Sequence, residues 1–159
     1  METYVLKKAG IEAFEGTEKS HYLNPQARRI NRSLGDLTGL TGFGFHLIEV
    51  NPGDDTTELH KYYHKDECVY VLEGEAQTTL GQEVVNLGPR DFVGYRAGGL
   101  PHKLTNSGTL VLKCIVVGQR LDHDVAAYPD INKRLHRNPE MPWNLVDIGN
   151  VSESQAGRK

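Results

Sequence analysis

The sequence predicts an all-β domain, an antiparallel sandwich or barrel, in its central part. Short apolar runs rich in Val, Ile, Leu, Tyr and Thr recur there about every 8–12 residues, with turn signals between them. No amphipathic stretch long enough for a substantial helix occurs between residues 40 and 118. The expected strands, in chain order, are Phe43–Val50, Leu59–Tyr63, Cys68–Glu73, Ala76–Leu80, Glu83–Leu87, Phe92–Tyr95, His102–Thr105 and Leu110–Val117.

The two ends of the chain lack this pattern. Residues 1–40 carry few apolar side chains and include a turn signal at Asn24-Pro25, so we expect an extended N-terminal arm. Residues 41–118 are expected to form the barrel core, and residues 119–159 an irregular extension that packs on the barrel and frays at its polar end. Within the extension, Ile131–His136 is expected to form one short helical turn. Because a long arm needs an anchor, we expect it to pack across the interface of a homodimer.

Composition excludes several classes of function. The 159 residues fit a single domain, and a formal net charge of -3 argues against a general electrostatic grip on nucleic acid. No apolar run of about 18 residues occurs, so no membrane span is expected. The N-terminus lacks the apolar core of a secretion signal, which predicts a cytoplasmic protein. Cys68 and Cys114 lie in apolar runs, and this favours reduced core thiols over a disulfide.

Residues able to bind a metal gather around two of the expected strands. His60, Tyr62 and Glu67 precede or open the run that ends at Glu73, and His102 follows a second Gly-rich segment. Two imidazoles and one carboxylate form a common ligand set for divalent metals, provided that the chain folds back on itself. The pattern indicates metal-assisted chemistry on a small molecule, which it does not identify.

These residues lie in two motifs that resemble those of the cupin superfamily, in its small single-domain bacterial form. The first motif has Gly, five residues, His-x-His, three or four residues, Glu, six residues and Gly. His60 and Tyr62 occupy the two histidine positions, and Glu67 and Gly74 keep the required spacing. The second motif ends in His-x3-Asn, which His102 and Asn106 match, while Arg96-Ala97-Gly98 stands at its Pro-x-Gly. The resemblance covers roughly residues 30–137, including Arg32–Asp36, Tyr70–Gly74 and Tyr128–Asp130.

The resemblance implies a double-stranded β-helix, a small jelly-roll barrel with its ligand site inside. It also implies a divalent ion, Zn, Mn, Fe or Ni, held by His60, Glu67 and His102. Alternate residues of a strand share a face, so Tyr62 would point into the barrel with His60. Asn106 is expected to serve as a structural hydrogen-bonding residue.

Tyr62 departs from the family pattern, which has a fourth ligand at this position. A tyrosine is a poor ligand unless it is deprotonated, and its unperturbed pKa is about 10. Three interpretations follow: Tyr62 ligates as a phenolate, or it donates a hydrogen bond to a substrate oxygen, or the metal has been lost and a polar pocket remains. His64 is an alternative ligand, although a surface histidine is the favoured interpretation because it lies at the turn between two strands.

Two classes of function agree with these observations. The first is an enzyme in which Tyr62 and Glu67 are catalytic, with a metal polarising an oxygen of the substrate. A sugar or sugar-phosphate isomerase is the best match, because relatives in the superfamily include such isomerases, and with iron a dioxygenase is an alternative. The second is a non-catalytic module that binds or senses a small molecule. A DNA-binding regulator is not expected, because no helix-turn-helix accompanies the barrel.

The remaining charged and imidazole residues have less specific interpretations. Arg28, Arg29 and Arg32 could bind a phosphate through their guanidinium groups, although a solvated basic arm is favoured. Arg96 could meet an anionic substrate at the barrel mouth, although a surface ion pair is the default. His46 is expected on the opposite strand face from Phe43, Phe45 and Leu47, and it is given no role.

Overall fold

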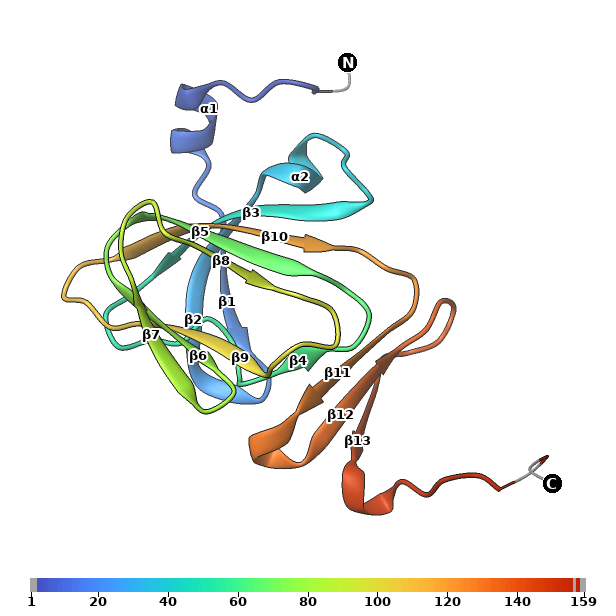
Figure 1. Ribbon diagram of the computed structural model, residues 1–159. Helices are drawn as coiled ribbons and strands as arrows, with labels where there is room; N and C mark the ends of the chain where they lie inside the picture. Colours follow the sequence, from blue (N-terminus) through green and yellow to red (C-terminus); the bar gives the residue numbers. More distant parts are fainter. Residues whose placement is uncertain (1–2, 156, 158–159) are drawn as a thin grey trace.

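The computed structural model describes residues 3–155 and residue 157, and within them the chain is mostly β (Figure 1). The helical elements are short: α1 (Lys8–Ala13), α2 (Leu34–Leu37) and two 3-10 turns (Pro129–Ile131 and Ile148–Asn150). The strands are β1 (Thr17–His21), β2 (Asn24–Ser33), β3 (Phe43–Val50), β4 (Lys61–Tyr62), β5 (Glu67–Glu73), β6 (Ala76–Leu80), β7 (Glu83–Leu87), β8 (Phe92–Tyr95), β9 (His102–Asn106), β10 (Leu112–Gln119), β11 (Asp124–Tyr128), β12 (Lys133–Arg137) and β13 (Asn144–Asp147).

Three antiparallel sheets make up the fold. A six-stranded sheet has the order β1-β2-β3-β10-β5-β8, a four-stranded sheet the order β13-β12-β11-β4, and a three-stranded sheet the order β7-β6-β9. In Figure 1 the six-stranded and three-stranded sheets face each other and form the barrel, and β11 to β13 extend from one side of it. Neighbours in the sheets are distant in sequence, as β3 and β10 show, so the structure agrees with the predicted double-stranded β-helix.

The barrel strands match the sequence prediction closely, and the reason is their alternating apolar pattern. β3, β6, β7 and β8 have the predicted bounds. The core lies between the sheets, where alternate side chains of β3, β5, β9 and β10 meet. Its members include Ile48, Val50, Val69, Val71, Leu104, Leu112 and Cys114. The predicted strand Leu59–Tyr63 is reduced to β4, because His60 pairs with His102 through an isolated bridge instead of continuing a ladder.

The N-terminal segment is more ordered than the expected extended arm. β1 and β2 form a hairpin, and β2 pairs with β3, so the hairpin is part of the six-stranded sheet. Polar contacts hold it there: Arg32 Nη1 lies 2.8 Å from Glu49 Oε1, and Asn24 Nδ2 donates to Asp55 Oδ2 at 3.1 Å. The apolar alternation that reveals a strand is missing because the buried side of β2 is mostly polar.

The C-terminal extension also differs from the prediction, since residues 124–147 are not irregular. β11, β12 and β13 form a meander, and β11 pairs with β4 of the barrel. Ala126, Tyr128 and Leu135 form a second apolar cluster beneath it. The helical turn expected at Ile131–His136 is wrong, because a 3-10 turn ends at Ile131 and β12 follows. The left-handed Asn132, at φ 52°, makes the reversal between β11 and β12.

Three smaller expectations can be compared directly with the structure. Asn106 is buried, and its amide nitrogen donates to the carbonyl oxygens of Val50 and Leu110, both at 2.8 Å, which confirms its structural role. Cys68 and Cys114 are both free thiols. Among the described residues, no helix has the length and apolar character needed to cross a membrane.

Candidate metal centre

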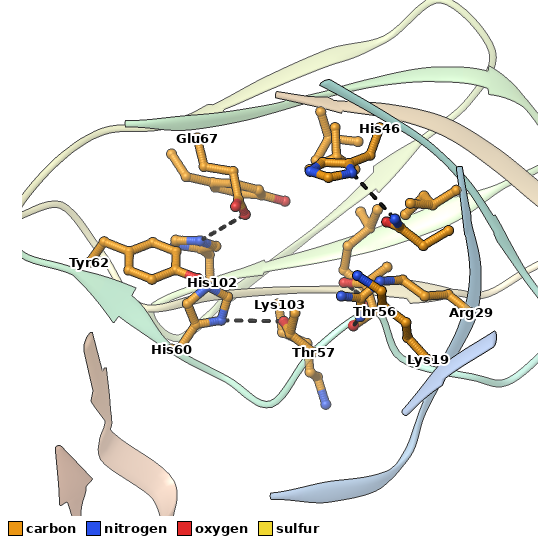
Figure 2. Close-up of a pocket in the computed structure, with 16 residues that line it drawn as sticks. Lys19, Arg29, His46, Thr56, Thr57, His60, Tyr62, Glu67, His102 and Lys103 are labelled. Carbon is orange, nitrogen blue, oxygen red and sulfur yellow. Dashed lines mark hydrogen bonds and ion pairs between the residues drawn. The ribbon is translucent and has the colours of Figure 1, made fainter. Parts of the chain in front are cut away.

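The candidate metal centre lies where the three sheets meet. His60 immediately precedes β4, Glu67 opens β5 and His102 opens β9, so the three residues come from segments next to or within three different sheets. An isolated antiparallel bridge joins His60 to His102, with N–O distances of 3.1 Å and 2.7 Å in the two directions. One potential ligand atom of each residue lies within 4.8 Å of the other two (Figure 2). The structure therefore brings together three of the residues that the sequence indicated.

The hydrogen bonds of both imidazoles leave one nitrogen of each ring free to bind a metal. The Nδ1 atom of His60 lies 2.8 Å from the carbonyl oxygen of Glu58, and that of His102 lies 3.3 Å from the carbonyl oxygen of Leu100. A carbonyl only accepts, so we assign the proton to Nδ1 in both rings. The two Nε2 atoms are buried without a hydrogen-bond partner in the structure. Unpartnered buried acceptors are costly, and a metal ion would satisfy both of them.

The electrostatic environment keeps both imidazoles neutral. Burial lowers the pKa of His60 to about 4. Burial, followed by the proximity of His60, lowers the pKa of His102 to about 4. Although His102 Nε2 lies 4.0 Å from Glu67 Oε1, the two do not form an ion pair at neutral pH, because the imidazole is uncharged. A neutral imidazole is the form that ligates a metal, so the residues fit a divalent cation.

Tyr62 lines the same cavity as the three candidate ligands. Its ring meets that of His60 edge to face, with centroids 4.7 Å apart. Burial, followed by the nearby charge of Glu67, raises the pKa of Tyr62 well above its ordinary value. The phenol is therefore protonated at neutral pH in the metal-free protein, and can donate a hydrogen bond.

His64 and Arg96 lie outside this arrangement. His64 is exposed in the loop between β4 and β5, and it is not part of the three-residue group. Arg96 is also exposed, and it lines a separate open groove beside β8 rather than the cavity. Neither side chain contributes to the lining of the cavity.

Lys65 is a residue of the site that the sequence analysis did not identify. It is only 8% exposed, and its ammonium lies 3.6 Å from the centroid of the Tyr62 ring and 4.0 Å from Glu67 Oε2. The cation–π contact and the carboxylate offset its loss of hydration. No periodic signal could have found it, because Lys65 lies in the loop between β4 and β5, outside any strand.

The metal centre occupies one end of a cavity of about 180 Å³. Figure 2 shows His60, Tyr62, Glu67 and His102 on one side, with Arg29 and Lys19 on the other. His46 also lines this cavity, and Asn31 Nδ2 lies 3.3 Å from its Nδ1 atom. No role was expected for His46, because Phe43 and Phe45 were expected to lie on the opposite face of the strand.

Comparison with known proteins agrees with this geometry. Residues 46–118 match the family model described as "Cupin domain". A crystal structure from Acidithiobacillus ferrooxidans, of a protein provisionally named a sugar phosphate isomerase, is 42% identical, with 96% of this chain and 97% of that chain covered and a TM-score of 0.92. A sugar phosphate isomerase of the cupin superfamily from Silicibacter pomeroyi shares the fold at 24% identity, with 95% and 97% covered and a TM-score of 0.77.

A curated relative is also similar over part of its length. An uncharacterised protein of Methanocaldococcus jannaschii is 36% identical over 64 residues, which are 40% of this chain. The match spans half the length of that relative.

The neutral state of the two buried histidines predicts that acid destabilises the metal-free protein. An unfolded histidine titrates at about 6.5, whereas His60 and His102 titrate at about 4 in the fold. The unfolded state therefore binds more protons between pH 6.5 and 4, and the free energy of unfolding falls as the pH is lowered through this window. We expect a loss of up to about 3 kcal/mol for each histidine.

Urea denaturation at several pH values, with a chelator present, measures this effect. The variant His102→Gln should lose roughly half of the pH dependence below pH 6.5, because one of the two titrating groups is gone. Equal slopes for the wild type and the variant would contradict the assignment.

Proposed function

The chain belongs to the cupin family, and we propose that it is a metal-dependent isomerase interconverting the aldose and ketose forms of a small sugar or sugar phosphate. The observation that carries this proposal is the pair of unpartnered Nε2 atoms of His60 and His102, which lie beside Glu67 inside a cavity. The provisional name of the similar protein, 42% identical over nearly the whole chain, supports the choice of reaction.

The residues of the cavity suit the proton transfers of such a reaction. A divalent cation held by His60, Glu67 and His102, whether Zn, Mn, Fe or Ni, would polarise a carbonyl oxygen of the substrate. Isomerisation moves one proton between neighbouring carbons and another between their oxygens. Among the described residues that line the cavity, Glu67 is the only carboxylate, so we assign the carbon-bound proton to the oxygen of Glu67 that does not hold the cation.

Tyr62 is the proposed partner of the substrate oxygen. The other phenol in the cavity, Tyr95, is held by a 2.9 Å hydrogen bond between its hydroxyl and Thr78 Oγ1. Tyr62 is protonated in this environment, so it can donate to an oxygen that becomes a hydroxyl. Lys65 lies over its ring, and the ammonium is 4.0 Å from Glu67 Oε2.

The size of the cavity limits the substrate. At about 180 Å³ it is smaller than the roughly 300–1,000 Å³ of sites that hold drug-sized ligands. A simple sugar derivative suits this volume, and a nucleotide sugar does not.

A homodimer remains part of the proposal. Two exposed aromatic residues support it: Phe92, in the edge strand β8, is 63% exposed, and Phe43, at the start of β3, lines the same open groove beside β8. Light scattering should give twice the chain mass of 17.7 kDa, and a monomer at micromolar concentration would refute this part.

Metal binding can be tested by removing one ligand. Elemental analysis should find a stoichiometric first-row metal in the wild type and none in the variant His102→Ala, because two donors hold a dication poorly. The matched control is His64→Ala, which removes an exposed histidine of the neighbouring loop and should leave the metal content unchanged. Loss of metal in the control but not in His102→Ala would show that His64, and not His102, is a metal ligand.

The role of Tyr62 can be tested with Tyr62→Phe, which removes only the hydroxyl. If the phenol moves a proton, kcat should fall by about 10²–10⁴-fold while the metal content is retained. Loss of metal, or loss of a phenolate charge-transfer band in iron-loaded protein, would instead identify Tyr62 as a ligand.

If the metal-replete wild type turns over no sugar phosphate, its oxygen uptake separates a dioxygenase from a non-catalytic binding module.

A further inference from the structure

We propose that the end of the cavity opposite the metal centre is a phosphate-binding site formed by Arg29 and Lys19, and that the substrate is therefore a phosphorylated sugar. The choice of a sugar rests on the proposed function, whereas the binding of phosphate does not. The two residues belong to the hairpin of β1 and β2, outside the segment that matches the family model.

The hairpin places two positive charges directly opposite each other. Lys19 and Arg29 are cross-strand partners in the register of β1 and β2, so their side chains leave the hairpin on the same face. Both line the cavity, and Figure 2 shows them on the side away from Glu67. Like charges directly opposite each other destabilise a strand pair, and an anion between them removes that penalty.

Arg29 differs from the other two arginines of β2 because it has no acidic partner. Arg28 Nη2 lies 2.9 Å from Asp54 Oδ1, and Arg32 pairs with Glu49. Among the described residues no carboxylate lies within ion-pair distance of Arg29 or Lys19, and the Arg29 guanidinium donates a hydrogen bond to the carbonyl oxygen of Thr56.

Strand alternation explains why Arg29 alone faces inward. Ala27 and Asn31, two positions to either side, are buried beneath the hairpin. A half-buried guanidinium with one carbonyl partner keeps several N–H donors for a ligand. Burial also lowers the pKa of Arg29, which is consistent with a positive charge that lacks full compensation.

The chemistry of this end favours phosphate over other anions. A phosphate ester carries about −1.5 to −2 charges at neutral pH, which two cations match, and its oxygens fit the planar fork of a guanidinium. A carboxylate carries one charge and leaves one cation unpaired. With its phosphate at Arg29, a sugar would extend through the cavity toward His60, Glu67 and His102.

The test is calorimetric titration of the full-length protein with inorganic phosphate, both as purified and after metal removal. The wild type should bind phosphate in both states, and acetate should not compete at equal concentration. Arg29→Gln should weaken binding by about tenfold or more, since charge-assisted hydrogen bonds are lost. Lys19→Gln should weaken it less, by about threefold, because this lysine is largely exposed and screened.

The matched control is Arg28→Gln, which removes the same charge from the adjacent residue of the same strand. Its affinity for phosphate should stay within about twofold of the wild type, since Arg28 is paired with Asp54 on the outer face. Absence of phosphate binding to the wild type, or equal losses in Arg28→Gln and Arg29→Gln, would overturn the proposal. If Arg29→Gln does not fold, as thermal unfolding would show, an unchanged affinity in Lys19→Gln would overturn it.

The result is separable from the proposed function. Phosphate binding that depends on Arg29, without turnover of any sugar phosphate, would refute the isomerase and leave the anion site. Turnover of unphosphorylated sugars without phosphate binding would refute the anion site and leave the isomerase.

Discussion

The antiparallel bridge between His60 and His102 is the contact on which the rest of the site depends. Its two backbone hydrogen bonds join the segment before β4 to the start of β9, and they hold the two imidazole centroids 4.5 Å apart. Tyr95 then stacks flat on His102, at 3.8 Å and 5° between the rings, and Thr78 holds the hydroxyl of Tyr95. The orientation of the imidazoles is therefore fixed by the protein, which is the preorganisation that a precise site requires.

The barrel and the centre of the site could be predicted from the sequence because both depend on spacing. Period-two alternation located the strands of the core, and it placed Glu67 on the buried face with Val69 and Val71, as the structure confirms. His60 and His102 follow from motif spacing. Their pairing across two sheets is a long-range contact, which the pattern of residues around each histidine does not specify.

The missed parts share one physical cause, which is that polar residues occupy buried faces. The inward side of β2 carries Ala27, Arg29 and Asn31, so the segment does not show the apolar alternation of a strand. His46 and Lys65 are likewise inward residues of polar type. Specific polar or aromatic contacts offset their burial: Asn31 of β2 lies beside His46, and Glu67 and the Tyr62 ring lie beside Lys65. Hydropathy patterns carry no information about such partners.

The anion site proposed at Arg29 lies on β2, outside the segment that matches the family model, and it would separate recognition from chemistry within one small protein. The proposed reacting end is built by residues between positions 60 and 102, whereas Lys19 and Arg29 of the opposite end come from the β1–β2 hairpin. Mutations that accumulate in the hairpin can change which molecules are retained without disturbing the atoms that react. Conversely, a one-residue slip in the pairing of β2 would turn Arg29 outward and bring a neighbour inward. Such a protein can therefore diverge in substrate range through its first 33 residues, while the barrel behind them keeps a single chemistry.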